Sequence, residues 1–115
     1  MLPQEIFNTV QTKLRSQREA STDGIHCMYR GRNGNRCAVG HLISDDIYDP
    51  KMEGLGISNL LARFELPNYF HLECSLIQEL QSAHDLHLVS SLDEWELEMQ
   101  KIAHRNRLIY TPEPL

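Results

Sequence analysis

The chain has 115 residues, of which 41% are hydrophobic and 23% are charged, as is ordinary for one globular domain. Its formal net charge of −5 argues against non-specific binding to DNA, and no apolar stretch approaches the ~20 residues that span a bilayer. The three cysteines, an odd count, fit poorly with a secreted disulfide framework. We therefore expect a cytoplasmic protein with no membrane partner, compact over residues 1–110 and extended over 111–115.

The first predicted element is a helix over residues 3–19. Pro3 suits the first helical turn, where its missing N–H costs nothing. Ile6, Val10 and Leu14 then recur every four residues, which places them on one helical face. The polar run at 21–24, Ser-Thr-Asp-Gly, predicts the end of this helix.

The segment 26–39 predicts a two-stranded β-hairpin. Asn33-Gly34 is among the strongest short hairpin signals, because both residues tolerate positive φ. A lone hairpin is marginal in water, so it must pack against helices. Together with four to five helices, this hairpin predicts an α+β fold.

The second half of the chain predicts further helices. Residues 44–56 are rich in Asp, Pro and Gly and predict a long irregular connection with one helical turn at most. A short helix capped by Ser58 should stop before Pro67, a longer helix should cover 70–87, and Ser91 begins a capping box for the last one. The expected core comprises Ile6, Val10, Leu14, Leu61, Phe64, Leu76, Ile77, Leu80, Trp95, Met99 and Ile102.

The most distinctive segment, residues 27–43, has the sequence CMYRGRNGNRCAVGHLI. It resembles a motif of the form C-x-Y-R-G-x-x-G-x-x-C-A-V-G-x-L-I in a family of small proteins from tailed phages and prophages. The resemblance extends weakly to Asp45-Asp46, Tyr48-Asp49-Pro50, Leu80-Gln81 and His84-Asp85. It implies a phage-type accessory protein and brings no established activity with it.

Zinc binding is one hypothesis for this segment. Cys27, Cys37 and His41 are suitable ligand types, with His26, His71 or Cys74 as a fourth. The spacing lacks the paired ligands of zinc fingers, and a two-residue hairpin turn would place the two thiols on opposite faces. The alternative, which we favour, is that the cysteines are small buried hydrophobes. We accordingly expect no metal and no cofactor.

Thiol catalysis is a second hypothesis, because Cys37, His84 and Asp85 have the residue types of a nucleophile, its base and an orienting group. A Cys37 that opened a helix would gain a lowered pKa. However, adjacent residues of a helix point about 100° apart, so we do not expect Asp85 to orient His84.

Binding of an anion or a partner is the third hypothesis. Arg30, Arg32 and Arg36 lie near the predicted hairpin tip, and Tyr29 supplies an aromatic surface beside them. Guanidinium groups suit phosphate and carboxylate. Alternatively, Arg30 or Arg36 bridges to the acidic 45–53 loop.

The sequence thus favours a small non-enzymatic interaction protein that modulates a host protein or a nucleotide signal, in counter-defence or host takeover. A thiol-dependent enzyme using Cys37 with His84 and a zinc-stabilised domain are the alternatives. The oligomeric state stays open.

Overall fold

The computed structural model describes residues 1–112, and the part of the predicted tail at 113–115 lies outside them. The described chain is mostly helical. Its α-helices are α1 Pro3–Gln17, α2 Ala38–Leu42, α3 Ile57–Arg63, α4 Tyr69–Leu72, α5 Cys74–Ala83 and α6 Leu92–Arg105. Two 3-10 turns, Arg32–Gly34 and Pro50–Met52, and one π turn, His84–Leu88, complete the regular structure.

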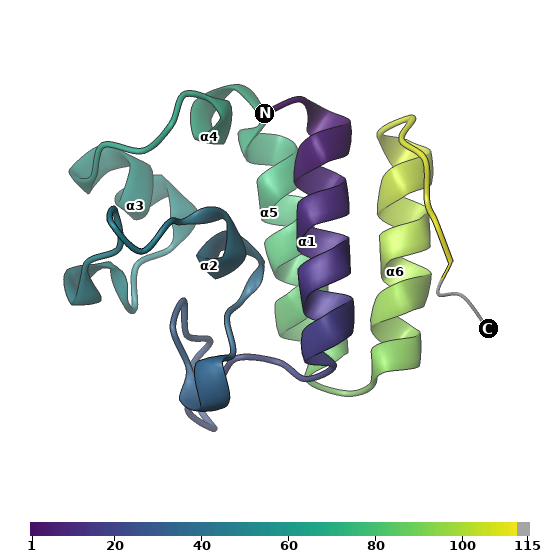
Figure 1. The fold of residues 1–115 in the computed structure, drawn as a ribbon, viewed down its shortest axis with the longest axis horizontal. Coiled ribbons are helices and arrows are strands. Elements are labelled where there is room, and N and C mark those ends of the chain that lie inside the picture. The colour runs from purple at the N-terminus through teal and green to yellow at the C-terminus, as the bar shows by residue number, and fades with distance from the viewer. Residues whose placement is uncertain (113–115) are drawn as a thin grey trace.

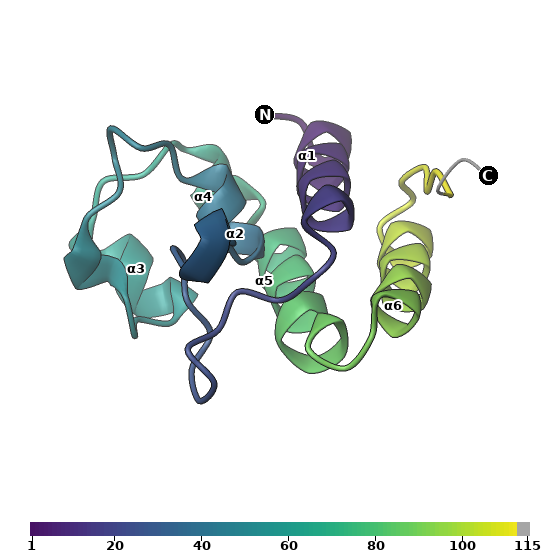
Figure 2. The same ribbon diagram turned by 60° about the horizontal axis from the view of Figure 1, so that its bottom comes forward.

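Three long helices form one side of the molecule. Helices α5, α1 and α6 stand side by side, and the shorter α2, α3 and α4 lie beyond α5 and α1 (Figure 1). The turned view shows the segment between α1 and α2 projecting below α2 and α5 (Figure 2). Helix α5 contacts α1, α2, α4, α6 and the π turn that follows it, so it is the element around which the core is built.

Helix α1 confirms its prediction to within two residues. Pro3 occupies the first turn, and the apolar face formed by Ile6, Val10 and Leu14 is buried. The helix ends where Arg18 takes a left-handed conformation with φ of 67°. A left-handed residue closes the last turn by directing its N–H back to a helix carbonyl, here that of Leu14.

The predicted β-hairpin is wrong, and with it the α+β fold class. Between residues 1 and 112, the only β pairing is one isolated antiparallel bridge between Thr22 and Cys27. Asn33 and Gly34 do adopt positive φ, 58° and 74°, as the turn signal predicts. The turn they form is a 3-10 turn, and the flanking segments do not pair as strands.

Side chains from other segments take the hydrogen bonds that a second strand would have made. The carboxylate of Glu53 accepts the amide N–H groups of Tyr29 and Arg30 at 2.9 and 3.0 Å. The Gln17 side chain accepts the N–H of Arg36 at 2.9 Å. Because buried backbone donors need only one good acceptor, these long-range partners make the ladder unnecessary.

Helix α2 begins at Ala38, where the sequence predicts a strand. The Cys37 thiol accepts the N–H of Gly40 at 3.4 Å and caps the first turn. A side chain at Gly40 would overlap the carbonyl oxygen of Tyr29, so glycine permits α2 to lie directly against this backbone. The close approach fixes segment 27–30 on the buried side of α2.

The later helices form where the sequence predicts them, but their first and last residues differ from the predicted ones. Residues 44–56 are irregular apart from the 3-10 turn at 50–52, as expected. Helix α3 begins after Gly56 instead of at Ser58, and the predicted helix 70–87 is divided at Glu73 and widened into the π turn after Ala83. The Ser91 hydroxyl accepts the N–H of Glu94 at 3.0 Å, which confirms the Ser91 half of the predicted capping box.

One hydrophobic core joins the elements. Nine of the predicted core residues are buried, whereas Leu61 and Phe64 are only partly buried. Tyr29 and Met52, which were not predicted to belong to the core, are buried as well. Cys37 is buried, as the favoured interpretation of the cysteines predicts, whereas Cys27 and Cys74 are partly exposed. Within residues 1–112, no helix has both the length and the apolar character to cross a membrane.

Candidate functional site

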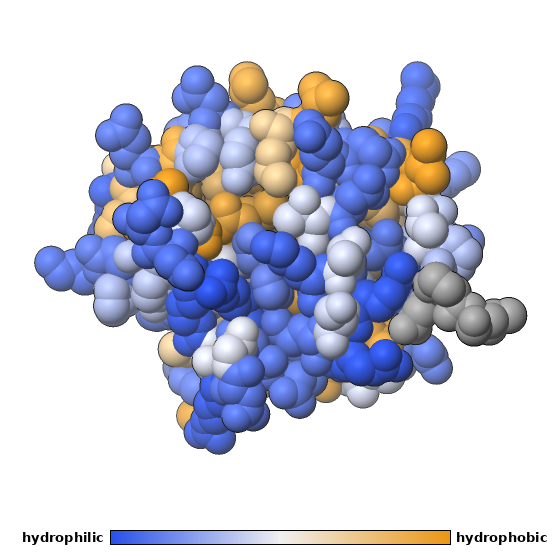
Figure 3. Space-filling model, in the orientation of Figure 1, coloured by the Kyte–Doolittle hydropathy of each residue, from blue (hydrophilic) through white to orange (hydrophobic). Residues whose placement is uncertain are grey.

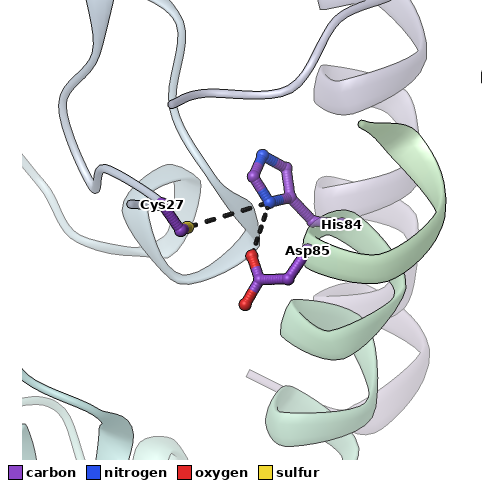
Figure 4. A group of neighbouring side chains, drawn as sticks. All are labelled: Cys27, His84 and Asp85. Atoms are coloured by element: carbon purple, nitrogen blue, oxygen red, sulfur yellow. Dashed lines mark hydrogen bonds and ion pairs between the residues drawn. The ribbon is translucent and has the colours of Figure 1, made fainter. Parts of the chain in front are cut away.

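A cysteine, a histidine and a carboxylate meet between the segment before α2 and the end of α5. The Nδ1 atom of His84 lies 3.8 Å from the Cys27 sulfur and 2.8 Å from Oδ1 of Asp85 (Figure 4). One ligand atom from each of the three residues lies within 4.8 Å of the others. We call this group the Cys27 cluster.

The π turn explains why two adjacent residues serve one cluster. The expectation that Asp85 could not reach His84 assumes α-helical geometry, and here it is wrong. The α-helix ends at Ala83, and a π turn has more residues in each turn, which lowers the angle between successive side chains. Both side chains can therefore point toward Cys27, as Figure 4 shows.

The hydrogen bonds of His84 show which ring nitrogen carries the proton. The backbone N–H of Ser21 donates to Nε2 at 2.9 Å, so Nε2 holds a lone pair. The proton of the neutral ring is then on Nδ1 and is donated to Asp85. Burial lowers the pKa of His84, but the hydrogen bonds with Asp85 and Cys27 outweigh it and raise the pKa to about 8. The Ser21 amide acts against that rise, because protonated Nε2 could not accept it.

The carboxylate of Asp85 accepts hydrogen bonds from several donors. Besides His84, the Nε2 amide of Gln81 donates to Oδ1 at 3.0 Å. Burial alone would raise the pKa of Asp85, but hydrogen bonds from His84 and Cys27 lower it overall. Asp85 is therefore an ionised acceptor.

The Cys27 sulfur is held as a thiol. The neighbouring Cys37 side chain and burial both raise its pKa well above the usual range. A thiolate at this position would stand beside the Asp85 carboxylate, and although the hydrogen bond with His84 favours the thiolate, Cys37 and burial outweigh it. The cluster thus has the residue types of a thiol enzyme without an activated nucleophile.

The predicted pairing of Cys37 with His84 is replaced by one with Cys27. Cys37 is fully buried at the start of α2, and its sulfur accepts the Gly40 amide. It neighbours Cys27 and thereby reaches the cluster only indirectly. Ser21 and Gln81 were not predicted, because nothing local marks a residue whose partner lies more than 50 positions away.

The zinc set proposed from sequence is only partly assembled. Cys27 and Cys37 are neighbours, but Nε2 of His41 donates to the Gln17 side chain at 2.8 Å instead of joining them. Cys74 begins α5 and His84 lies beyond its other end, so the helix separates them. His26 lies nearer, since it lines two pockets beside the cluster.

Two pockets open beside the Cys27 cluster. One, of about 250 Å³, extends toward Leu55 and Ile57, and the other, of about 320 Å³, extends toward Ile25 and Val89. Cys27 and Asp85 line both pockets. Cys27 and Asp85 are thus partly exposed beside these pockets, while the His84 ring is buried.

Tyr29 and Arg30, predicted to contact a partner, are directed inward. The guanidinium of Arg30 donates to the carbonyls of Gly40 and Ile43 at 2.7 and 2.8 Å and pairs with Asp45 at 3.1 Å. Tyr29 is 7% exposed, and its hydroxyl donates to the Leu55 carbonyl. The sequence alternative in which Arg30 bridges to the acidic loop matches these contacts.

Arg32 and Arg36 are placed differently from Arg30. Arg36 shares Asp45 with Arg30, at 3.0 Å, and keeps part of its surface exposed. Arg32 is exposed on the 3-10 turn. These two arginines remain accessible to a binding partner, whereas Arg30 holds the loop.

A third pocket, of about 380 Å³, lies between α1 and the 3-10 turn. Its lining includes Lys13, Ser16, Asn33 and His41. Burial and the positive charges of Lys13, Arg36 and Arg30 lower the pKa of His41 to about 4. We call the surface formed by the cationic side chains of Lys13, Arg32 and Arg36, together with the uncharged ring of His41, the cationic face.

The surrounding surface is largely polar. Figure 3 shows hydrophilic side chains over most of the face seen in Figure 1, with hydrophobic ones gathered toward its upper edge. Comparison of the chain with family models, curated proteins and solved structures gives no match. Its function is therefore inferred from the chain's own residues.

Proposed function

We propose that the protein is a non-enzymatic binding protein that recognises an anionic group of its partner at the cationic face. The single observation that carries this proposal is the pocket between α1 and the 3-10 turn, which Lys13 lines and which Arg32 adjoins through its chain neighbour Asn33. Lys13, Arg36 and Arg30 act together on His41 in a chain whose net charge is −5. Such a local field attracts anions that the rest of the surface repels.

The donors at the pocket suit phosphate or carboxylate. Lys13 supplies an ammonium group, and Ser16 and Asn33 supply neutral hydrogen-bond donors. Nε2 of His41 is engaged with Gln17, which leaves Nδ1 as the ring atom that could take up a proton beside a bound anion. Arg32 and Arg36 would add the charge-assisted hydrogen bonds that favour oxyanions.

The kind of partner is proposed from the resemblance of segment 27–43. A phage-type accessory protein in the cytoplasm would use this face on a host protein or a nucleotide signal, in counter-defence or host takeover. The thiol-enzyme alternative has weaker support, because Cys27 is held as a thiol and Cys37 is buried. Anion binding at the cationic face does not involve the cysteines.

The test is NMR titration with inorganic phosphate and with a nucleoside triphosphate. We expect saturable shifts of the Asn33, Gly34 and His41 signals, and a rise in the pKa of His41 on binding. The double variant Lys13→Ala with Arg32→Ala should weaken binding at least tenfold. Lys101→Ala on α6 is the matched control and should bind like the wild type.

Two results would refute the proposal. One is the absence of saturation at this pocket with either phosphate compound and with an acidic peptide. The other is equal loss of binding in the Lys101→Ala control, which would mean that the anion responds to overall charge and not to the cationic face.

A further inference from the structure

We infer that Cys27, His84 and Asp85 form a binding site for zinc or a similar thiophilic divalent cation, with a fourth position open to an exogenous ligand. This site is separate from the cationic face. Three different ligand types, from two distant segments, meet there at one point that two pockets reach.

The ligand set matches the preference of zinc. A thiolate, an imidazole nitrogen and a carboxylate oxygen are the three kinds of protein ligand that zinc takes. Metal–ligand distances of about 2.0 to 2.3 Å place tetrahedral ligands about 3.3 to 3.6 Å apart. Two of the observed separations, 3.8 Å from sulfur to Nδ1 and 2.8 Å from Nδ1 to Oδ1, bracket that range, and the sulfur and the carboxylate lie within 4.8 Å of each other. Small side-chain movements would therefore suffice.

The fourth coordination position is open because the three ligand residues are buried to different extents. His84 is 1% exposed, but the Asp85 side chain is 38% exposed, and Asp85 and Cys27 line both pockets. Three protein ligands with one solvent-facing position are typical of zinc sites that bind water or a substrate, as distinct from closed structural sites. Cys37, which neighbours Cys27 from the buried side, is the one further sulfur that could close the site.

Metal binding requires a defined exchange of protons. The Cys27 thiol releases one proton to solvent, so Cys27 and Asp85 together supply two negative charges to the cation. The proton on Nδ1 of His84 must move to Nε2, where the Ser21 N–H now donates at 2.9 Å. The Ser21 amide then loses its acceptor. The metal-free and metal-bound forms are for this reason two distinct hydrogen-bonded states.

Cobalt(II) provides a direct test, because it substitutes for zinc and reports its ligands by colour. The full chain, freed of metal by a chelator, is titrated with cobalt(II) and then with zinc(II). We expect one equivalent to give a sulfur-to-cobalt absorption band and the visible bands of a tetrahedral centre, and zinc to abolish them. Nitrogen-15 NMR of the metal-free and zinc-bound forms should show that the His84 proton moves from Nδ1 to Nε2 on binding.

Variants assign the site. Cys27→Ser should remove the sulfur band, and Asp85→Asn should weaken cobalt binding at least tenfold. Cys74→Ser, at the far end of α5, is the control and should keep the spectrum. If Cys27→Ser does not fold, the wild-type chain still decides the question, because bound zinc should protect Cys27 from alkylation by iodoacetamide.

The inference is overturned if folded wild-type protein shows no sulfur-to-cobalt band at one equivalent, if Cys74→Ser alone abolishes it, or if zinc leaves Cys27 alkylation unchanged. Phosphate titration of the metal-free protein tests the cationic face independently, so failure of one proposal is distinguishable from failure of the other.

Discussion

The amide N–H of Arg30 donates to Oε2 of Glu53 at 3.0 Å, across 23 positions of the chain. The other carboxylate oxygen accepts the Tyr29 amide at 2.9 Å, and the Tyr48 hydroxyl also donates to Glu53, at 2.7 Å. One side chain thereby satisfies the N–H groups of two consecutive residues, of which a single partner strand could have paired only one. Glu53 is the residue that makes segment 27–30 an anchored loop.

Glu53→Ala should therefore destabilise the protein substantially. Leaving a buried donor without its acceptor costs about 1 to 3 kcal/mol, so the two amide groups that lose Glu53 should cost ~2 to 6 kcal/mol together. Urea denaturation followed by circular dichroism measures this change. Glu65→Ala, at an exposed glutamate, is the control and should change the unfolding free energy by less than ~0.5 kcal/mol. Equal effects in both variants would contradict the assigned role.

Gly40→Ala should also be strongly destabilising. The added methyl group would overlap the Tyr29 carbonyl oxygen, which is backbone and cannot move aside cheaply. Overpacking of this kind costs about 1 to 3 kcal/mol or more. Gly56→Ser is the control, because a side chain there meets nothing within 4 Å and Ser is a good N-cap for α3. A Gly40→Ala variant that melts with the wild type would refute the close packing.

Substitution of Arg30 should reduce stability, whereas substitution of Arg32 should reduce anion binding. Arg30→Ala removes the donors to the Gly40 and Ile43 carbonyls, so we expect a loss of about 2 to 3 kcal/mol in unfolding free energy. Arg32 is exposed on the 3-10 turn, and Arg32→Ala should change stability by less than ~0.5 kcal/mol while weakening anion binding. Thermal denaturation and phosphate titration of the two variants test both halves. A stable Arg30→Ala variant would return Arg30 to the set of possible contact residues.

His41 should make the protein sensitive to mild acid. Its pKa is lowered to about 4 in the folded state by burial and the positive charges around it, while an unfolded histidine titrates near 6.5. Between these values the unfolded chain binds more protons, so stability falls as pH decreases from about 6.5 to 4. His41→Gln should flatten the stability–pH curve in this window. An unchanged slope would show that other groups cause it.

The three cysteines should differ in reactivity toward iodoacetamide at neutral pH. Cys74 should react first, Cys27 slowly because its pKa is raised, and Cys37 last because it is fully buried. Peptide mapping by mass spectrometry at successive times measures the order. Rapid modification of Cys37 in the folded protein would revive the thiol-enzyme hypothesis.

Elements whose signals are local could be predicted from the sequence. The four-residue apolar repeat of α1 and the Ser91 cap of α6 appear at the predicted positions, because helical periodicity and capping involve residues a few positions apart. The turn at Asn33-Gly34 is likewise recognisable from its own two residues. The pairing of the segments that flank this turn is not a local property. The sequence could not show that their N–H groups bond to distant side chains instead of to each other.

The position of the chemistry, in contrast, depends on how distant segments pack. Glu53 and Gln17 replace the hairpin ladder, and the π turn brings His84 and Asp85 together toward Cys27. Each of these arrangements depends on a residue 19 or more positions away or on a departure from α-helical geometry. Hydrogen-bond partners at that range are selected by packing, because the core determines which segments lie close enough for their polar groups to bond.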